Sequence, residues 1–152
     1  FANKRMLAVI QRGKVPRGYY QMLADALRNA RVQGPAILTE LGEIDNPDMI
    51  AEVADLLLRE DETTWTMCTG YWNGKLLISI RTSEEGNLAG KVMRHVVGRK
   101  GTVGGHLTYA GGQIPLMEGT AAKREEIEEH IEKRFLDAIG ADGDPGVRLV
   151  RM

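Results

Sequence analysis

The chain has 152 residues, of which 43% are hydrophobic and 27% charged, and its formal net charge is −1. This length and composition fit one globular domain, and the near-neutral charge argues against sequence-independent duplex binding, which needs clustered Lys and Arg. No apolar run approaches the ~20 residues of a membrane-spanning helix, so no membrane partner is expected. Cys68 is the single cysteine, which excludes an internal disulfide and leads us to expect a reducing, cytoplasmic location.

The first third of the chain is expected to alternate helices and strands. Residues 3–12 can form a short helix, a second helix is predicted over 19–30 from apolar spacings of three and four, and residues 36–42 read as a strand. A further helix is expected after Asn46 as N-cap, with Pro47 at its first helical position. Its apolar face would consist of Ile50, Val53, Ala54, Leu57 and Leu58.

The strongest local signal predicts a β-hairpin over residues 63–83. Asn73-Gly74 tolerates the positive φ angles of a type I′ turn between the two strands. In the second strand, Leu76, Ile78 and Ile80 share one face, and Leu77, Ser79 and Arg81 share the other. If the first face is core, the alternation of side chains turns Arg81 away from it.

The second half of the chain is predicted to contain two helices. The first covers residues 87–97, and the second covers 121–138, with Thr120 as N-cap and Ile127, Ile131, Phe135 and Ala138 on one face. Between them lies a glycine-rich stretch and a short strand over 113–117 that Pro115 places near a strand end or a sheet edge; residues 140–146 read as a loop. The fold class expected is α/β (α+β), a single domain with a mixed β-sheet flanked by helices.

The glycine-rich stretch, GTVGGHLTYAGG over 101–112, surrounds His106 with five glycines. Glycine lets backbone N–H groups approach a ligand closely, and a short helix starting near His106 would add its N-terminal donors. Gly104, Gly105 and His106 therefore outline an anion pocket. Arg81 could grip a phosphate there through its planar guanidinium, with help from Ser83 and the hydroxyls before it.

Other candidates are weaker. Glu126 and His130 have a metal-ligand spacing on the last helix, but they lie in a charged run that is typical of a solvated face. Asp142 and Asp144 fall in a turn, and Cys68 lies in a predicted strand, where an inert buried thiol is expected. We therefore predict no metal ligand and no catalytic residue in this chain.

Two segments together resemble the C-terminal DHH-associated domain of the DHH-family phosphoesterases: LLISIRTS over 76–83 and NLAGKVMRHVVGRKGTVGGHLTYAGG over 87–112. That family includes RecJ-like exonucleases, nanoRNase/pAp phosphatases and cyclic-di-AMP phosphodiesterases. Its pattern is a strand ending in Ser-x-Arg-Ser, a helix, and a glycine–histidine motif. Here it falls on Ser79, Arg81 and Ser83, with Thr82 in the place of the motif's last serine, and on 104–106 with Ala110 and Gly111. The similarity covers about residues 45–117.

The resemblance implies a division of labour between two domains. A DHH catalytic domain would carry two divalent metal ions, commonly manganese, and this chain, which has no DHH motif, would supply the substrate-binding half. Residues 1–18 would then be a linker toward the missing N-terminal domain, and residues 19–152 the DHH-associated domain. The implied substrate is a nucleotide or a short RNA or DNA oligonucleotide, held at its phosphate by Arg81, Ser83, Gly104, Gly105 and His106. The isolated chain is expected to be inactive as a hydrolase.

Two alternatives stay open at this point. The chain could be a non-catalytic RNA-binding module, although its charge argues against that. It could also form a homodimer through a surface containing Trp65 and Trp72 of the hairpin.

Overall fold

The computed structural model describes residues 13–86, 88–105, 108–116 and 121–151. Over these residues it contains four helices and a seven-stranded sheet. The elements in chain order are α2 (Arg17–Asn29), β1 (Arg31–Gln33), β2 (Ala36–Glu43), α3 (Asp48–Leu57), β3 (Trp65–Trp72), β4 (Lys75–Thr82), α4 (Leu88–Val97), β5 (Thr102–Gly105), β6 (Tyr109–Pro115), α5 (Ala121–Ala138) and β7 (Gly146–Arg148).

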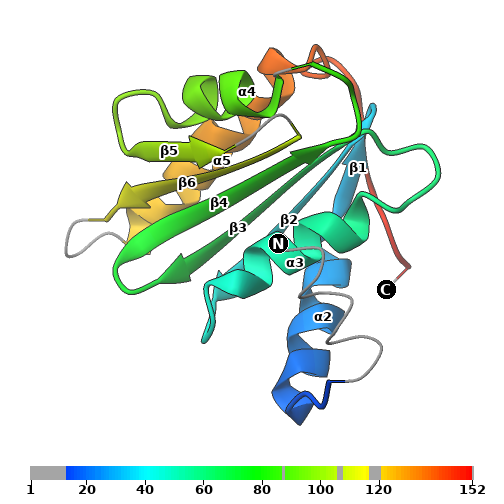
Figure 1. Cartoon of the computed structure of the whole chain (residues 1–152), viewed down its shortest axis with the longest axis vertical. Helices are drawn as coiled ribbons and strands as arrows, with labels where there is room; N and C mark the ends of the chain where they lie inside the picture. The colour runs from blue at the N-terminus through cyan, green and yellow to red at the C-terminus, as the bar shows by residue number, and fades with distance from the viewer. Residues whose placement is uncertain (1–12, 87, 106–107, 117–120, 152) are drawn as a thin grey trace.

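The sheet has the strand order β5-β6-β4-β3-β2-β1-β7. Only the β2–β3 pair is parallel, and the other neighbouring pairs are antiparallel. Helices α2 and α3 pack on one face, and α4 and α5 pack on the other, so the domain has three layers (Figure 1). The predicted α/β domain with a mixed sheet flanked by helices is confirmed.

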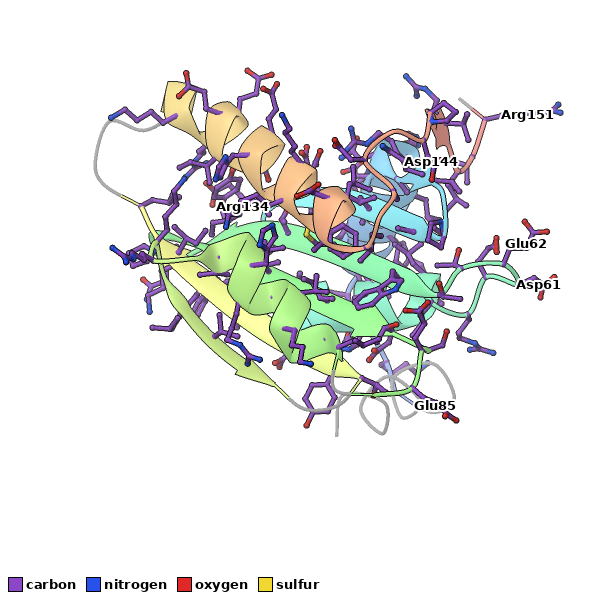
Figure 2. The ribbon with its side chains drawn as sticks, turned by 90° about the horizontal axis from the view of Figure 1, so that it is seen from above. Asp61, Glu62, Glu85, Arg134, Asp144 and Arg151 are labelled. Atoms are coloured by element: carbon purple, nitrogen blue, oxygen red, sulfur yellow. The ribbon has the colours of Figure 1, made fainter. Side chains whose placement is uncertain are left out.

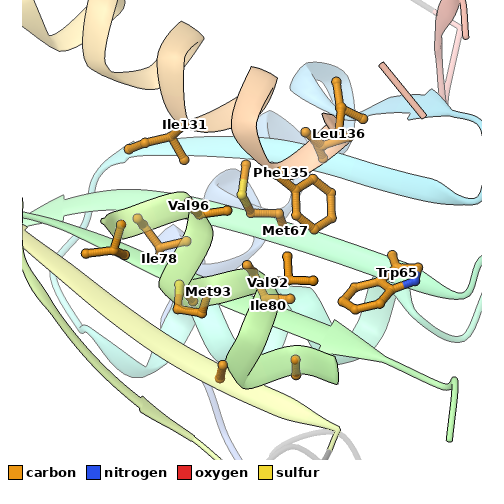
Figure 3. Packing of buried hydrophobic residues seen from close by; sticks show 14 of the residues in the cluster. Trp65, Met67, Ile78, Ile80, Val92, Met93, Val96, Ile131, Phe135 and Leu136 are labelled. Atoms are coloured by element: carbon orange, nitrogen blue, oxygen red, sulfur yellow. The ribbon is translucent and has the colours of Figure 1, made fainter. Parts of the chain in front are cut away.

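The larger part of the core lies between the sheet and helices α4 and α5 (Figure 3). The inward side chains of β3 and β4 meet those of both helices there, and Trp65 packs edge-on against Phe135 with ring centroids 6.2 Å apart. Arg134 joins the two helices, because its Nε donates to the carbonyl oxygen of His95 at 2.6 Å (Figure 2). Burial of these apolar side chains supplies the main force that holds the two helices on the sheet.

The opposite face is covered by α2 and α3 through a second, smaller apolar cluster. Two buried threonine hydroxyls tie these helices to the sheet: Thr39 donates to the carbonyl of Ala26 at 2.5 Å, and Thr66 donates to that of Ala54 at 2.9 Å. Helix α2 packs on β2, and α3 packs on β3 and β4. On this face the strands β5 and β6 keep exposed residues.

The predicted hairpin is confirmed. Asn73 has φ 52° and Gly74 has φ 74°, as a type I′ turn requires, and it joins β3 and β4 in the expected positions. The helix start at Asn46 is also confirmed, because the side-chain oxygen of Asn46 accepts a hydrogen bond from the backbone N–H of Asp48 at 2.9 Å.

The glycine-rich stretch differs from the prediction. It forms the strands β5 and β6, and β6 already begins at Tyr109, so no helix starts within the described residues next to His106. The physical reason is that β6 pairs with β4 along its whole length and thereby satisfies its backbone groups.

Smaller differences concern strand ends and one helix face. The short strands β1 and β7 were not predicted; they pair with each other, which converts part of the predicted C-terminal loop into a sheet edge. On α5, Ala138 is exposed, and Leu136 is buried in its place. The predicted helix over 3–12 and the cap at Thr120 lie outside the described residues.

Candidate binding site on the open half of the sheet

Cross-strand register brings Arg81, Ser79 and Gly104 onto one face of the sheet, whereas the predicted site residue Gly105 lies on the other face, opposite buried Ala110. Arg81 of β4 lies opposite Tyr109 of β6, and Ser79 lies opposite Gly111, which in turn faces Gly104 of β5. Directly opposed residues in antiparallel strands share a face. This is the face that α3 covers over β3 and β4 and leaves open over β5 and β6.

The Arg81 guanidinium is held by three neighbours. Its Nε donates to Asp55 Oδ1 at 2.7 Å, its Nη1 donates to the carbonyl oxygen of Ile80 at 3.1 Å, and its Cζ lies 5.3 Å from the ring centroid of Tyr109. The side chains of Arg81 and Asp55 are only 10% and 11% exposed. A guanidinium has five N–H donors, and these two hydrogen bonds engage two of them.

The prediction that Arg81 points away from the main core is therefore confirmed, but its setting is not the open one that a lone phosphate-binding arginine would have. Asp55 neutralises its charge in the structure described, and the ion pair fixes the guanidinium in one orientation. An anion that binds here meets an arginine that is already oriented, which lowers the entropic cost of gripping it.

The serine and threonine next to Arg81 have different surroundings. Ser83 lies just beyond the end of β4 and is exposed, and its backbone N–H donates to the carbonyl of Thr64 at 3.1 Å. Thr82 is buried on the opposite face, and its hydroxyl donates to the same carbonyl at 2.8 Å. Of the two, Ser83 is thus the one accessible to a ligand.

The two glycines before His106 also differ. A Cβ atom on Gly104 would meet nothing within 4 Å, whereas one on Gly105 would come within 2.6 Å of the Cα of Ala110 and of the carbonyl oxygen of Tyr109. Close packing therefore explains why position 105 is a glycine, whereas position 104 has room for a side chain. His106 lies outside the described residues, so its predicted role stays a prediction.

Beside these residues the sheet is hollowed. The glycine hollow, as we call it, is an open depression of about 370 Å³, within the size range of small-molecule sites. Its floor is formed by Ser79, Gly104 and Gly111, and Pro47 and Ile50 at the start of α3 form one wall. Thr102 and Gln113 lie at the end of the hollow farther from Arg81.

Sequence reasoning missed Asp55 and Tyr109. In the sequence, Asp55 is only a carboxylate next to the apolar face of a predicted helix. Its pairing with Arg81 depends on the packing of α3 on β4, which the sequence pattern does not predict. The signal for Tyr109 was its position two residues before Gly111, which becomes meaningful once the segment is known to be a strand. Both residues reach Arg81 from other elements.

The weaker candidates differ in their exposure to solvent. Glu126 and His130 are exposed, and within the described residues no group of three or more His, Cys, Asp or Glu could hold a metal ion. Cys68 is fully buried, and burial raises the pKa of its thiol, which leaves it protonated. Trp65 is 3% exposed and belongs to the core, so it cannot contribute to the dimer surface that the sequence suggested.

A second polar cluster lies on the opposite face of the sheet, under α5. Burial, together with a hydrogen bond that protonated Glu40 donates to Glu132, raises the pKa of Glu40 to about 8, and burial also raises the pKa of Glu128. The hydroxyl of Thr69 lies 3.1 Å from Glu128 Oε1, and Arg31 pairs with Glu132. These contacts attach the middle of α5 to the sheet, on the face opposite to the glycine hollow.

The comparisons with known proteins agree with this geometry. The family described as the DHHA1 domain matches residues 33–137. An uncharacterized protein of Methanocaldococcus jannaschii is 30% identical over 146 residues, which are 92% of this chain and 30% of that protein. The chain thus spans about a third of the length of this relative.

A solved structure shares the fold. It is an exopolyphosphatase-related protein from Bacteroides fragilis, with a TM-score of 0.58 and 15% identity over 90% of this chain and 40% of that one. The described helices include none long and apolar enough to cross a membrane. Because the family match covers most of the sequence, including β4 with Arg81 and the strands of the glycine hollow, the chain belongs to the DHHA1 family, the DHH-associated domain of the DHH phosphoesterases.

Proposed function

We propose that this chain is the substrate-binding domain of a metal-dependent DHH phosphoesterase that acts on short oligonucleotides, pAp or cyclic dinucleotides. The observation that carries the proposal is the placement of Arg81, Ser79, Gly104 and Gly111 on one face of the sheet, where the part covered by α3 borders the open part over β5 and β6. In this proposal, hydrolysis takes place at two divalent metal ions, manganese being the expected metal, in a separate DHH domain of the same polypeptide.

Arg81 is the phosphate ligand in this proposal. Its ion pair with Asp55 and its contact with Tyr109 orient the guanidinium, and a phosphate oxygen would take N–H groups that these contacts do not use. Ser83 would add a hydroxyl at the end of the strand, and Gly104 and Gly105 would allow the backbone to approach. His106 would donate a further hydrogen bond to the phosphate.

The assignment is tested by calorimetric titration of pAp and of a dinucleotide into the chain and into Arg81→Gln and Arg81→Lys. Removing one charged donor is expected to weaken binding about tenfold or more, the effect of ~1.4 kcal/mol. Arg81→Lys keeps the charge but loses the planar fork, so it is expected to bind more weakly than the wild type while staying folded.

Arg124 offers a matched control. It also pairs with a carboxylate, Glu43, at 2.7 Å and also lies over a tyrosine ring, that of Tyr71 at 4.1 Å, but on the α5 face of the sheet. Arg124→Gln should leave the affinity unchanged. Unaltered affinity in a folded Arg81→Gln variant, or an equal loss in both variants, would show that Arg81 does not hold the phosphate.

Two further measurements separate this function from the alternatives. Metal-dependent hydrolysis of a dinucleotide by this chain alone would contradict the proposed division of labour. Binding of single-stranded RNA with a steep salt dependence, and without competition from mononucleotides, would favour an RNA-binding module instead. A cytoplasmic location is proposed with the function, in line with the buried, protonated thiol of the single cysteine.

A further inference from the structure

We propose that the glycine hollow is the subsite for the flat ring of the substrate, a nucleobase, and that Gln113 and Thr102 read the edge of that ring. This inference rests on the proposed function, because it assigns the part of the same nucleotide that lies beyond the phosphate held by Arg81. It predicts a nucleotide, rather than a sugar phosphate or a chain of inorganic phosphates, as the ligand class.

The glycines of β5 and β6 provide the first argument. A Cβ on Gly105 or on Gly112 would collide with neighbouring atoms at 2.6 and 2.7 Å, so close packing requires glycine at both positions. Gly104 and Gly111 have no such neighbour and no positive φ, and the two are direct cross-strand partners. A glycine inside a strand weakens it and often marks a bulge, a bend, or a place where a ligand or another backbone approaches closely. Packing within the described residues gives no reason for these two.

The shape of the hollow provides the second argument. Without side chains at Gly104 and Gly111, two adjacent strands present bare peptide planes as a flat floor. The aliphatic side chains of Pro47 and Ile50 stand at one side of this floor. A planar ring with apolar faces fits such a slot, whereas a bulky or strongly charged group has no cationic partner among the residues that line it.

The polar groups at the far end provide the third argument. Gln113 Nε2 donates to Thr102 Oγ1 at 3.1 Å, and each of these residues lies two positions along its strand from a floor glycine. An amide and a hydroxyl at the end of a flat slot offer both donors and acceptors, which is what the edge of a nucleobase requires. The faces of the ring would thus meet the glycine floor and the apolar wall, and its edge would meet the polar side chains of Gln113 and Thr102.

The spacing to the phosphate ligand provides the fourth argument. Arg81 and Tyr109 lie two residues from Ser79 and Gly111 in the direction opposite to Gln113, a step of about 7 Å along the strands. A pentose between the ring and the phosphate covers a step of that length. The exposed ring of Tyr109 stands where this sugar would pass.

The test compares three probes on the full 152-residue chain: adenosine 5′-monophosphate, ribose 5-phosphate and inorganic tripolyphosphate. The wild type is expected to bind the nucleotide about tenfold or more tightly than the sugar phosphate. Gly111→Val fills the floor with a side chain whose Cβ meets nothing within 4 Å, so it should abolish this advantage and leave ribose 5-phosphate binding unchanged. Gly143→Val is the matched control, because its Cβ also meets nothing within 4 Å but lies in the C-terminal loop.

The outcomes separate the two proposals. Equal binding of nucleotide and sugar phosphate by the wild type, or a nucleotide advantage that survives in folded Gly111→Val, overturns the ring subsite and leaves the phosphate site standing. Binding of none of the probes, nor of pAp or a dinucleotide, overturns the proposed function itself. Should Gly111→Val fail to fold, Gly111→Ala supplies a smaller obstruction, and Gln113→Leu should alter the preference between adenosine and uridine monophosphates without affecting ribose 5-phosphate.

Discussion

Replacing each of two adjacent glycines of β6 by alanine should have opposite effects on stability. Gly111 faces the open side of the sheet, and a Cβ there meets nothing within 4 Å. Gly112 faces α4, where a Cβ would lie 2.7 Å from Met93 Sδ and 2.9 Å from Val97 Cγ2. Both helix side chains are buried in the main core, so they would have to shift within close packing, or α4 would have to move away from the sheet.

The magnitude follows from comparing the two variants with each other. Both changes reduce the conformational freedom of the unfolded chain in the same way, so that contribution cancels in the difference. What remains is the overpacking at Gly112, which is about 1–3 kcal/mol. Gly111→Ala alone should stabilise the domain by about 0.4–1 kcal/mol, since its backbone is ordinary strand.

The measurement is urea denaturation of both variants and the wild type followed by circular dichroism, with the free energy of unfolding taken from curves of equal slope. In thermal unfolding, each kcal/mol should separate the melting temperatures by about 2–4 °C for a domain of this size. If Gly111→Ala lost as much stability as Gly112→Ala, the assignment of these glycines to opposite faces would be refuted, and the glycine hollow would lose its basis.

Three other predictions concern the polar contacts. Because Glu40 holds its proton up to a pKa of about 8 in the fold, against 4.5 ordinarily, its contribution to stability is fully present below about pH 4.5 and is lost as the pH rises to 8; Glu40→Gln should flatten this decline in pH-dependent unfolding curves. Asp55→Ala leaves buried Arg81 without its partner and should cost about 3–5 kcal/mol in denaturant unfolding, whereas the exposed Asp25→Ala should cost less than about 1 kcal/mol; similar losses would show that Arg81 is solvated. Thr66→Val removes the hydroxyl bond to α3 and should cost about 1 kcal/mol, and an unchanged denaturation midpoint would show that the bond contributes nothing.

Local rules were enough wherever neighbouring residues in the chain decide the conformation. The turn at Asn73-Gly74 depends on the φ preferences of two residues, and it alone fixed the register of β3 against β4. The alternation of side chains along β4 then determined which face Arg81 occupies. The helices were predictable for a similar reason, because their apolar stripes repeat within a few turns.

The glycine-rich segment could not be predicted in this way. Glycine has little preference for a strand, so the state of β6 was decided by backbone hydrogen bonds to β4, which lies more than twenty residues earlier in the chain, and the state of β5 was decided by its pairing with β6. The short pairing of β1 with β7 has the same origin, because it joins residues more than a hundred positions apart.

The sequence by itself determined the class of fold, the family and the residues from which a phosphate site could be built. The tertiary structure decided how those residues are surrounded: Asp55 neutralises the guanidinium of Arg81, packing requires Gly105 but leaves Gly104 open, and burial under α5 keeps a proton on Glu40. Burial, charge pairing and free space depend on which distant segments the fold brings together, and local residue preferences do not specify these.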